Sequence, residues 1–389
     1  MDKKRKKAKI TFKSLIPYIV GVVIGLFIVI IGGFFSGTEE TAGDGSLAAD
    51  MLVLLTIVLS IVMGFILHVI LHEAGHLIAG YLSGYKFVSF SVGSFIIIRQ
   101  NGKLKMKRFA IAGAGGQCLM SPPEPIDNTY PFILYYLGGG LMNLLASGIF
   151  LSLYFLLRDT FSYAGEISIP AFALGVLTGL MNLLPLKING LVTDGHNAVS
   201  LGKNEQARQV HWLLLTANAR ITSGERAKNL PEEWFDFSEN YDFNDAIMAN
   251  IATMGLSRLI DAHDFCAAKK LAEEILDKGD KLIELLKNEA RCELLFLEII
   301  EEPSQERTDK IEKLFTPELE KYIKASKTHL SKYRLMYAYE KLVLYDEEKS
   351  KKTIAAFNKI CLVYPHTGDC ESEKELVSII DNLAAEHSK

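Results

Sequence analysis

The sequence of 389 residues predicts a mainly α-helical fold, in which a bundle of about four membrane-spanning helices precedes a soluble helical domain. Three observations predict this fold. Nearly all the long apolar runs fall within residues 1–200, so that half of the chain suits a lipid environment. Beyond residue 201, apolar residues recur at three- and four-residue spacing, which is typical of amphipathic helices. One apolar run also leads directly into a His-Glu-x-x-His pattern at residues 72–76.

The N-terminal segment indicates the orientation of the chain. Residues 1–13 are densely basic, and the positive-inside rule keeps such a segment in the cytoplasm. The apolar run at residues 14–35 is longer than the core of a signal peptide and no clear cleavage site follows it, so we interpret it as an uncleaved first span. Residues 36–50 then form a short, acidic external loop.

The second predicted span, residues 52–82, carries the residues with the clearest chemistry. Its first twenty residues have no formal charge, and a run of about this length crosses a bilayer core. His72 and His76 are four residues apart, so they share one helix face and can both bind a Zn²⁺ ion, and Glu73 can reach a water molecule beside it. A chance pattern in a soluble helix is the alternative, but a carboxylate and paired imidazoles are rare in membrane segments.

His68 lies one further turn upstream, on the same face as the two histidines of the motif. It could support a metal ligand from behind, or it could be a packed neighbour that binds no metal. One helix cannot easily direct three successive imidazoles at one ion, so we favour the packed neighbour. The motif itself ends about 15 Å before Lys86, at 1.5 Å per residue, so water must reach the site from the cytoplasmic side.

A predicted β-hairpin at residues 86–112 follows this span. Apolar and polar residues alternate up to Ile98, Asn101-Gly102 is a strong turn signal, and the alternation then resumes. The hairpin is either an ordinary cytosolic loop or a surface element whose edge strand holds an extended peptide substrate. The Gly-rich, Pro-broken stretch from residue 112 to Pro123 is too short to span a membrane, and we interpret it as re-entrant.

The third predicted span, residues 131–157, contains three consecutive glycines, 138 to 140, and Asn143 in its first half. Small residues of this kind allow close packing of membrane helices. A buried asparagine needs hydrogen-bond partners, and Asn143 has two interpretations. It could bind a substrate backbone or a developing oxyanion beside the metal, or it could bond only to another helix.

The fourth predicted span, residues 167–186, ends in Asn182-Leu-Leu-Pro185, and the proline frees backbone groups there. A catalytic zinc site with two histidines needs a third protein ligand, and Asp194 is our candidate. Asp194 could instead be a turn or capping residue at the start of the following helix. His196 is a less favoured substitute ligand.

The motif HEAGH in one apolar helix, followed by NLLP and then Asp-Gly at the end of a later one, resembles the site-2 protease family of intramembrane zinc metalloproteases. The resemblance covers roughly residues 50–200 and rests on both motifs occurring in this order. It implies zinc as the cofactor, with Glu73 as the general acid and base. The zinc ligands that it implies are His72, His76 and Asp194.

The same resemblance implies a substrate-positioning role for four further residues: Gly139 and Asn143, which fit a Gly-x-x-x-Asn pattern, and Asn182 and Pro185, which match an Asn-Pro pair. Two features depart from the family. The separation between Pro185 and Asp194 is longer than in its compact form, and no PDZ-like segment lies between the catalytic spans.

Residues 201–389 are predicted to form a cytosolic helical domain that resembles tetratricopeptide repeats, although the period is irregular. Residues 248–276 have the pattern of a helical hairpin. Such an array either binds a cytosolic protein partner in a groove or only stabilises the chain. The five cysteines show no paired spacing and are interpreted as reduced thiols.

Three functions are compatible with these features. The first is a multipass zinc endopeptidase that cuts membrane-spanning or membrane-associated peptides near the cytoplasmic leaflet. The alternatives are a non-catalytic, zinc-containing membrane scaffold and, less well supported, a transporter. A broad basic patch with interleaved aromatics is missing from the sequence, which gives nucleic-acid binding no support. The location expected is a bacterial cytoplasmic membrane, with both chain termini in the cytosol.

Overall fold

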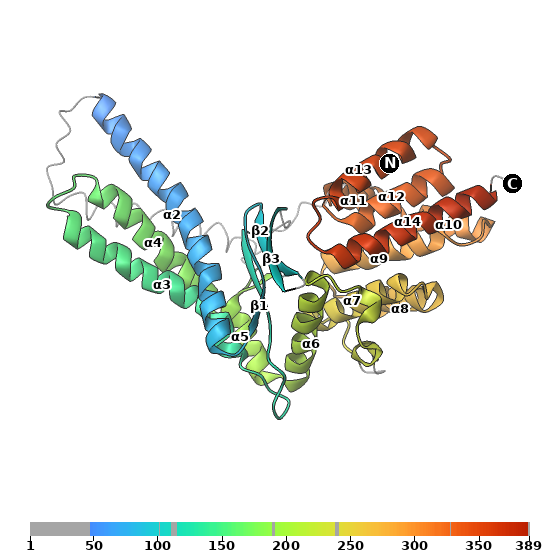
Figure 1. The fold of residues 1–389 in the computed structure, drawn as a ribbon, viewed down its shortest axis with the longest axis horizontal. Helices are drawn as coiled ribbons and strands as arrows, with labels where there is room; N and C mark the ends of the chain where they lie inside the picture. The colour runs from blue at the N-terminus through green and yellow to red at the C-terminus, as the bar shows by residue number, and fades with distance from the viewer. Residues whose placement is uncertain are drawn as a thin grey trace, which may run out of the picture. The chain divides into compact units, whose positions relative to one another are not determined.

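The structure is a computed structural model, and it describes residues 47–100, 102–109, 115–188, 191–237, 241–326 and 328–387. The predicted basic segment 1–13 and first span 14–35 lie outside these residues. The described chain is mainly helical, with α-helices α2 to α14 and a small antiparallel sheet (Figure 1). Its contacts divide it into two compact units. The first contains residues 47–76, 136–187 and 192–196, and the second contains the remainder.

Three helices are long and apolar enough to cross a membrane: α2 (Leu47–Leu82), α3 (Phe132–Leu157) and α4 (Ala164–Leu183). They coincide with the predicted spans 52–82, 131–157 and 167–186 to within a few residues. The last helix ends three residues early because Leu184 is extended (ψ 138°), as the residue before a proline prefers to be.

Helix α2 exposes large apolar side chains on most of its surface. Leu54 and Met63 are both 62% exposed, and Phe65 is 52% exposed. In water, a continuous apolar surface of this kind would be covered by a partner or would cause aggregation. This helix therefore has the surface that a lipid environment requires.

The four-stranded sheet belongs to the second unit, and its strand order is β3-β2-β1-β4 with antiparallel neighbours. The predicted hairpin is present, since Gln100 pairs with Lys103 across the expected turn and Gly102 has a φ of 75°. The alternating run up to Ile98 is not one strand, however, because Gly93 (φ 57°) turns the chain after Val92. The strands are β1 (Lys86–Val92), β2 (Phe95–Gln100), β3 (Lys103–Arg108) and β4 (Gly116–Ser121).

The re-entrant interpretation of the stretch before Pro123 is wrong for the residues that the structure describes. Gly116–Ser121 is strand β4, which pairs with β1 along its length. The side chains of Cys118 and Met120 point to the same face and are buried, at 6% and 0% exposed. Pairing with β1 satisfies the backbone polar groups of this apolar segment, so it needs no membrane environment to explain its composition.

A two-stranded ribbon and the remaining helices complete the described chain. Their bounds are β5 (Lys187–Ile188), β6 (Leu191–Val192), α5 (Asp194–Lys203), α6 (Glu205–Thr222), α7 (Ala246–Asp261), α8 (Phe265–Lys278), α9 (Glu284–Ile299), α10 (Gln305–Leu314), α11 (Pro317–Ala325), α12 (Leu330–Leu342), α13 (Glu347–Cys361) and α14 (Thr367–His387). Short 3₁₀ turns cover Ala227–Asn229 and Glu232–Phe235.

Helices α7 to α14 share one apolar core in the second unit. The predicted helical hairpin is α7 and α8, and Asp264 begins its second helix by accepting a hydrogen bond from the Ala267 amide. Helix lengths range from 9 residues in α11 to 21 in α14, so they do not follow one period. The structure thus establishes an array of helices around one core, but it does not establish the predicted tetratricopeptide fold.

Two buried cations on α12 tie this array together. Lys332 Nζ lies 2.8 Å from a carboxylate oxygen of Glu289 on α9. Arg334 bonds to Glu293 on α9 at 2.5 Å and to Glu373 on α14 at 2.8 Å. Both cations are at most 2% exposed, and removing one partner of a buried pair leaves an uncompensated charge. These pairs therefore fix how α9, α12 and α14 pack.

Helix α6 is tied to the segment after the sheet by two hydrogen bonds. Tyr130 Oη lies 2.7 Å from His211 Nδ1, and Trp212 Nε1 donates to the Pro123 carbonyl at 2.9 Å. His211 is buried, and burial lowers the pKa of its imidazole to about 4. The tyrosine hydroxyl therefore donates to a neutral imidazole.

This burial predicts acid sensitivity of the second unit. The folded pKa of His211 lies below its ordinary value of 6.5, so the unfolded chain takes up a proton first as the pH falls. The contribution of neutral His211 to the free energy of unfolding should be fully present above about pH 6.5. It should decline by up to about 3 kcal/mol as the pH falls toward 4. The chain has two tryptophans, Trp212 and Trp234, whose ring centroids are 6.2 Å apart, so tryptophan fluorescence reports on this region. Urea unfolding followed by their fluorescence should therefore be less pH-dependent in His211→Gln, and an unchanged pH dependence would contradict the assignment.

Candidate metal centre

The two histidines of the motif lie on α2 at a close contact with α3. A Cβ atom at Gly75 would be 2.3 Å from the backbone oxygen of Gly138, a distance that real side chains do not adopt. A Cβ at Gly139 would be 2.5 Å from His76 Nε2 and 2.7 Å from His72 Nε2. The two glycines are therefore needed so that α3 can pack against the imidazoles.

Glycines 138 to 140 lie where α3 meets α2 and α4. The backbone carbonyl of Gly138 lies against Gly75 of α2, and Gly139 faces the imidazoles. Gly140 faces α4, where a Cβ would be 2.6 Å from the side chain of Leu183 and 3.1 Å from the Gly179 oxygen. One turn of α3 thus brings α2 and α4 together around the histidines.

Asp194 is placed by the break at the end of α4. The hydroxyl of Thr193 donates to the Leu184 carbonyl at 2.6 Å and accepts from the amides of Leu186 and His196 at 3.0 and 3.3 Å. Thr193 is therefore the residue that caps α5, and Asp194 is the first residue of the helix. The capping role considered for Asp194 belongs to its neighbour, which leaves the Asp194 carboxylate available to the histidines.

Gly195 allows α5 to begin directly against the end of α4. A Cβ at this position would be 2.0 Å from the Leu183 carbonyl oxygen. The longer separation between Pro185 and Asp194 does not move the carboxylate away, because β5 and β6 pair as a short ribbon and bring the chain back to Leu186. The Thr193 amide donates to the Leu186 carbonyl at 3.1 Å.

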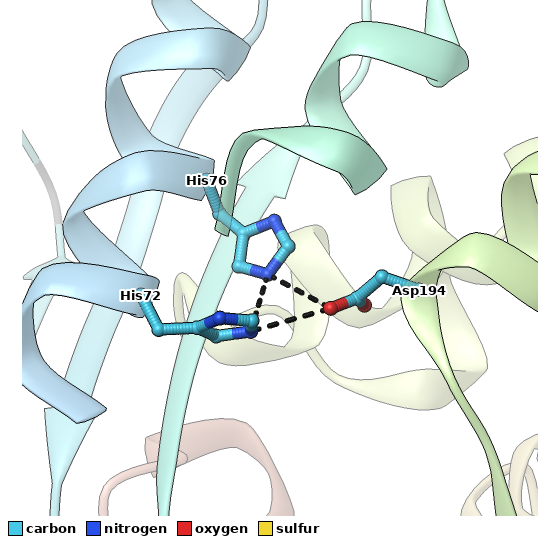
Figure 2. Close-up of side chains that lie close together, drawn as sticks. All are labelled: His72, His76 and Asp194. Carbon is cyan, nitrogen blue, oxygen red and sulfur yellow. Dashed lines mark hydrogen bonds and ion pairs between the residues drawn. The ribbon is translucent and has the colours of Figure 1, made fainter. Parts of the chain in front are cut away.

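Figure 2 shows the three side chains converging, with His72 and His76 from one helix and Asp194 from another. The two Nε2 atoms are 3.1 Å apart. Asp194 Oδ2 lies 3.2 Å from His72 Nε2 and 3.4 Å from His76 Nε2. In the part of the chain that the structure describes, these three residues are the group of side chains arranged to hold a metal ion.

The donor set fits a divalent cation. Two imidazoles and one carboxylate are a common ligand set for catalytic zinc, whose fourth position is open to water. Three atoms with lone pairs at these distances repel one another unless protons or a cation lie between them. Burial raises the pKa of Asp194, but hydrogen bonds from His72 and His76 outweigh this effect and lower the pKa to about 2. The carboxylate is therefore ionised at neutral pH, as a metal ligand must be.

Asn143 lies behind the cluster, not in it. Its Nδ2 is 3.4 Å from Nδ1 of His72 and 3.1 Å from the Thr178 hydroxyl, and its Oδ1 is 3.4 Å from Nδ1 of His68. His68 is 1% exposed, and its Nε2 lies 2.8 Å from the Ala171 carbonyl on α4. His68 therefore belongs to a polar network that ends at a candidate metal ligand.

The other predicted site residues occupy different places. Glu73 follows His72 and is buried, at 8% exposed. Asn182 donates to the Thr178 carbonyl of its own helix at 3.0 Å, and Pro185 is exposed beyond the end of that helix. His196 is half-buried and is not a member of the three-residue cluster.

Sequence reasoning missed two threonines of this region. Thr193 caps α5, and Thr178 joins the network of Asn143. A threonine directly before Asp-Gly is an ordinary capping signal and could have identified the first. The second has no local signal, because its partner lies 35 positions away in the sequence.

Comparison with protein-family models, with curated proteins and with solved structures finds no match for this chain. The metal centre is therefore argued from the geometry of its residues alone.

A substitution at Gly139 should abolish metal binding. In Gly139→Ala, the new methyl group would press against both Nε2 atoms, so we expect bound zinc to fall from about one per chain to near zero. Gly148→Ala is the matched control, because a Cβ there meets nothing within 4 Å. Zinc should be quantified in both detergent-purified variants. Equal zinc in the two variants would contradict the placement of the metal.

Proposed function

We propose that the chain is an intramembrane zinc metalloendopeptidase that resembles the site-2 protease family. The observation that supports this best is the convergence of His72, His76 and Asp194. Both histidines and the buried Glu73 belong to a helix long and apolar enough to cross a membrane. A purely structural metal site would not need a carboxylate directly beside its ligands. Polar and ionisable groups are costly in a membrane segment, and they are usually kept there for function.

The chemistry is hydrolysis of a peptide bond. When bound, zinc supplies Lewis acidity, which polarises a carbonyl and makes water more acidic. Glu73 accepts a proton from the attacking water as its oxygen bonds to the carbonyl carbon. The same carboxyl group then gives this proton to the leaving nitrogen as the C–N bond breaks. The products are one new carboxyl group and one new amine, and Glu73 returns to its starting form.

The substrate class is a membrane-spanning or membrane-associated peptide. A peptide bond in a helix is shielded, so a protease of this kind needs its substrate in an extended form, and an edge strand can hold it. The sheet has two edge strands. Strand β3 carries Lys103, Lys105 and Lys107, which discourage pairing, whereas β4 carries no charge. Of the two edges, β4 is thus the one without charges that discourage pairing.

The proposed setting is the cytoplasmic membrane of a bacterium, with both termini in the cytosol. The basic residues 1–13 and the lysines of β3 support this orientation by the positive-inside rule. The role proposed for residues 201–389, with their helical array, is to bind a cytosolic protein partner.

Replacing Glu73 tests catalysis separately from metal binding. Glu73→Gln keeps the size of the side chain but removes the base, so cleavage should fall at least about 100-fold while bound zinc is unchanged. Asp194→Ala should lower both, because it removes a ligand. The measurements are zinc content and cleavage of a panel of single-span peptides by each purified protein in detergent.

The outcomes separate the proposals. Equal cleavage by wild type and Glu73→Gln would refute the assigned base. Zinc bound at this site with no cleavage of any peptide by the wild type would favour a membrane scaffold. Loss of zinc in Glu73→Gln would show that this carboxylate is itself a ligand.

A further inference from the structure

His68 is a buried polar side chain that the proposed reaction does not use. It lies between the candidate metal ligands and α4, and its ring is enclosed by other residues. A Cβ at Gly175 would be 2.2 Å from His68 Cε1, so α4 has a glycine where the ring packs. Phe150 lies against the ring, with centroids 5.8 Å apart. Such a site holds the imidazole in one orientation, with both nitrogens facing defined partners.

The proton of His68 can be placed from these partners. Its Nε2 lies 2.8 Å from the Ala171 carbonyl oxygen, which can only accept a hydrogen bond. Nε2 therefore carries a proton. In the neutral ring, Nδ1 then has a lone pair and needs a donor. The group that faces Nδ1 is the side-chain amide of Asn143, at 3.4 Å.

Metal binding likewise determines which ring nitrogen of His72 carries the proton. If Nε2 of His72 binds a metal ion, the remaining ring proton must be on Nδ1. The group that faces this nitrogen is again the amide of Asn143, 3.4 Å away. An Nδ1–H group needs an acceptor, so the amide must present its oxygen to His72.

These two requirements select the same orientation of the Asn143 amide, in which Oδ1 and Nδ2 exchange the positions given above. With the oxygen toward His72 and the NH₂ group toward His68, every ring nitrogen has a suitable partner. The Thr178 hydroxyl, which donates to the Leu174 carbonyl at 2.8 Å, then has to turn its proton to the Asn143 oxygen, 3.1 Å away. The opposite orientation gives His72 a donor at Nδ1, which leaves its proton on Nε2, the atom that faces Asp194. The two ends of an amide are nearly equal in size, so hydrogen bonding alone decides between the orientations.

We propose that His68 orients the amide of Asn143, and that this amide in turn holds His72 in the tautomer whose Nε2 can bind the metal ion. Both are positioning residues, since neither belongs to the three-residue cluster. The inference rests on the proposed metal centre and does not require that the protein be a peptidase. Hydrogen-bonded partners of metal-binding histidines typically contribute 10- to 100-fold to metal affinity.

The hydrogen-bonded chain from His68 through Asn143 to His72, here called the relay, predicts that a change at position 143 can restore zinc affinity lost by a change at position 68. His68→Phe keeps a ring in the packed site but leaves the amide without its fixed acceptor, so zinc affinity should fall roughly tenfold. Asn143→Asp presents an acceptor oxygen at either end, so it can bond to His72 Nδ1–H whatever occupies position 68. The double variant His68→Phe/Asn143→Asp should therefore regain most of the lost affinity. Asn143→Leu, which has no acceptor, should lose affinity in either background.

Zinc affinity should be measured by competition with a chromophoric chelator on the full chain in detergent. The absorption spectrum of the cobalt-substituted protein reports whether the ligand geometry is retained. Phe150→Leu is the matched control, because it alters packing against His68 without removing a hydrogen bond of the relay. Each variant must elute as a single species before it is compared.

The results distinguish this inference from the proposed metal centre. Wild-type affinity in His68→Phe would overturn the relay, and so would a double variant no better than His68→Phe alone, or an equal loss in Phe150→Leu. In all these cases the metal centre itself would stand. A wild-type chain that binds no zinc would overturn both.

Discussion

The close approach of α2 and α3 is the constraint on which the candidate site depends. Gly75 lets α2 meet the backbone of α3 at Gly138, and Gly139 leaves space for two imidazoles where another residue would place a methyl group. Because lipid tails are as apolar as the helix surfaces, membrane helices associate through close packing and hydrogen bonds and not through the hydrophobic effect. The glycines therefore stabilise the helix pair and at the same time create the space for a polar site.

The histidines of that polar site are held by residues of two other helices. Asp194 comes from the start of α5, which Thr193 ties to the end of α4. Asn143 comes from α3 and connects His72 to His68. Desolvated polar groups are costly unless they are paired, so each member of this network constrains its neighbours. The network favours one set of tautomers, which the proposed metal centre would need.

The second unit is stabilised differently. Its helices share a broad apolar core, and buried ion pairs from α12 fix the packing of α9 and α14. The sheet is part of this unit, since Gln100 donates to the Pro365 carbonyl and Lys107 to the Tyr364 carbonyl, both between α13 and α14. A partner that binds the helical array near these residues would contact the same body that carries the edge strands.

Sequence alone determined the apolar helices, the turn at Gly102 and the juxtaposition of His72 with His76, because these depend on composition, on turn residues and on the period of a helix. The sequence also identified Asp194 as a candidate metal ligand. It left open a capping role for Asp194, and in the structure Thr193 performs that role. Only the tertiary structure decided that the stretch before Pro123 is a strand, because its partner β1 offers hydrogen bonds that no local pattern records. Likewise, the link from His68 through Asn143 to His72 joins residues up to 75 positions apart. Contacts at that separation are set by how helices pack, and helix packing is decided by the whole chain.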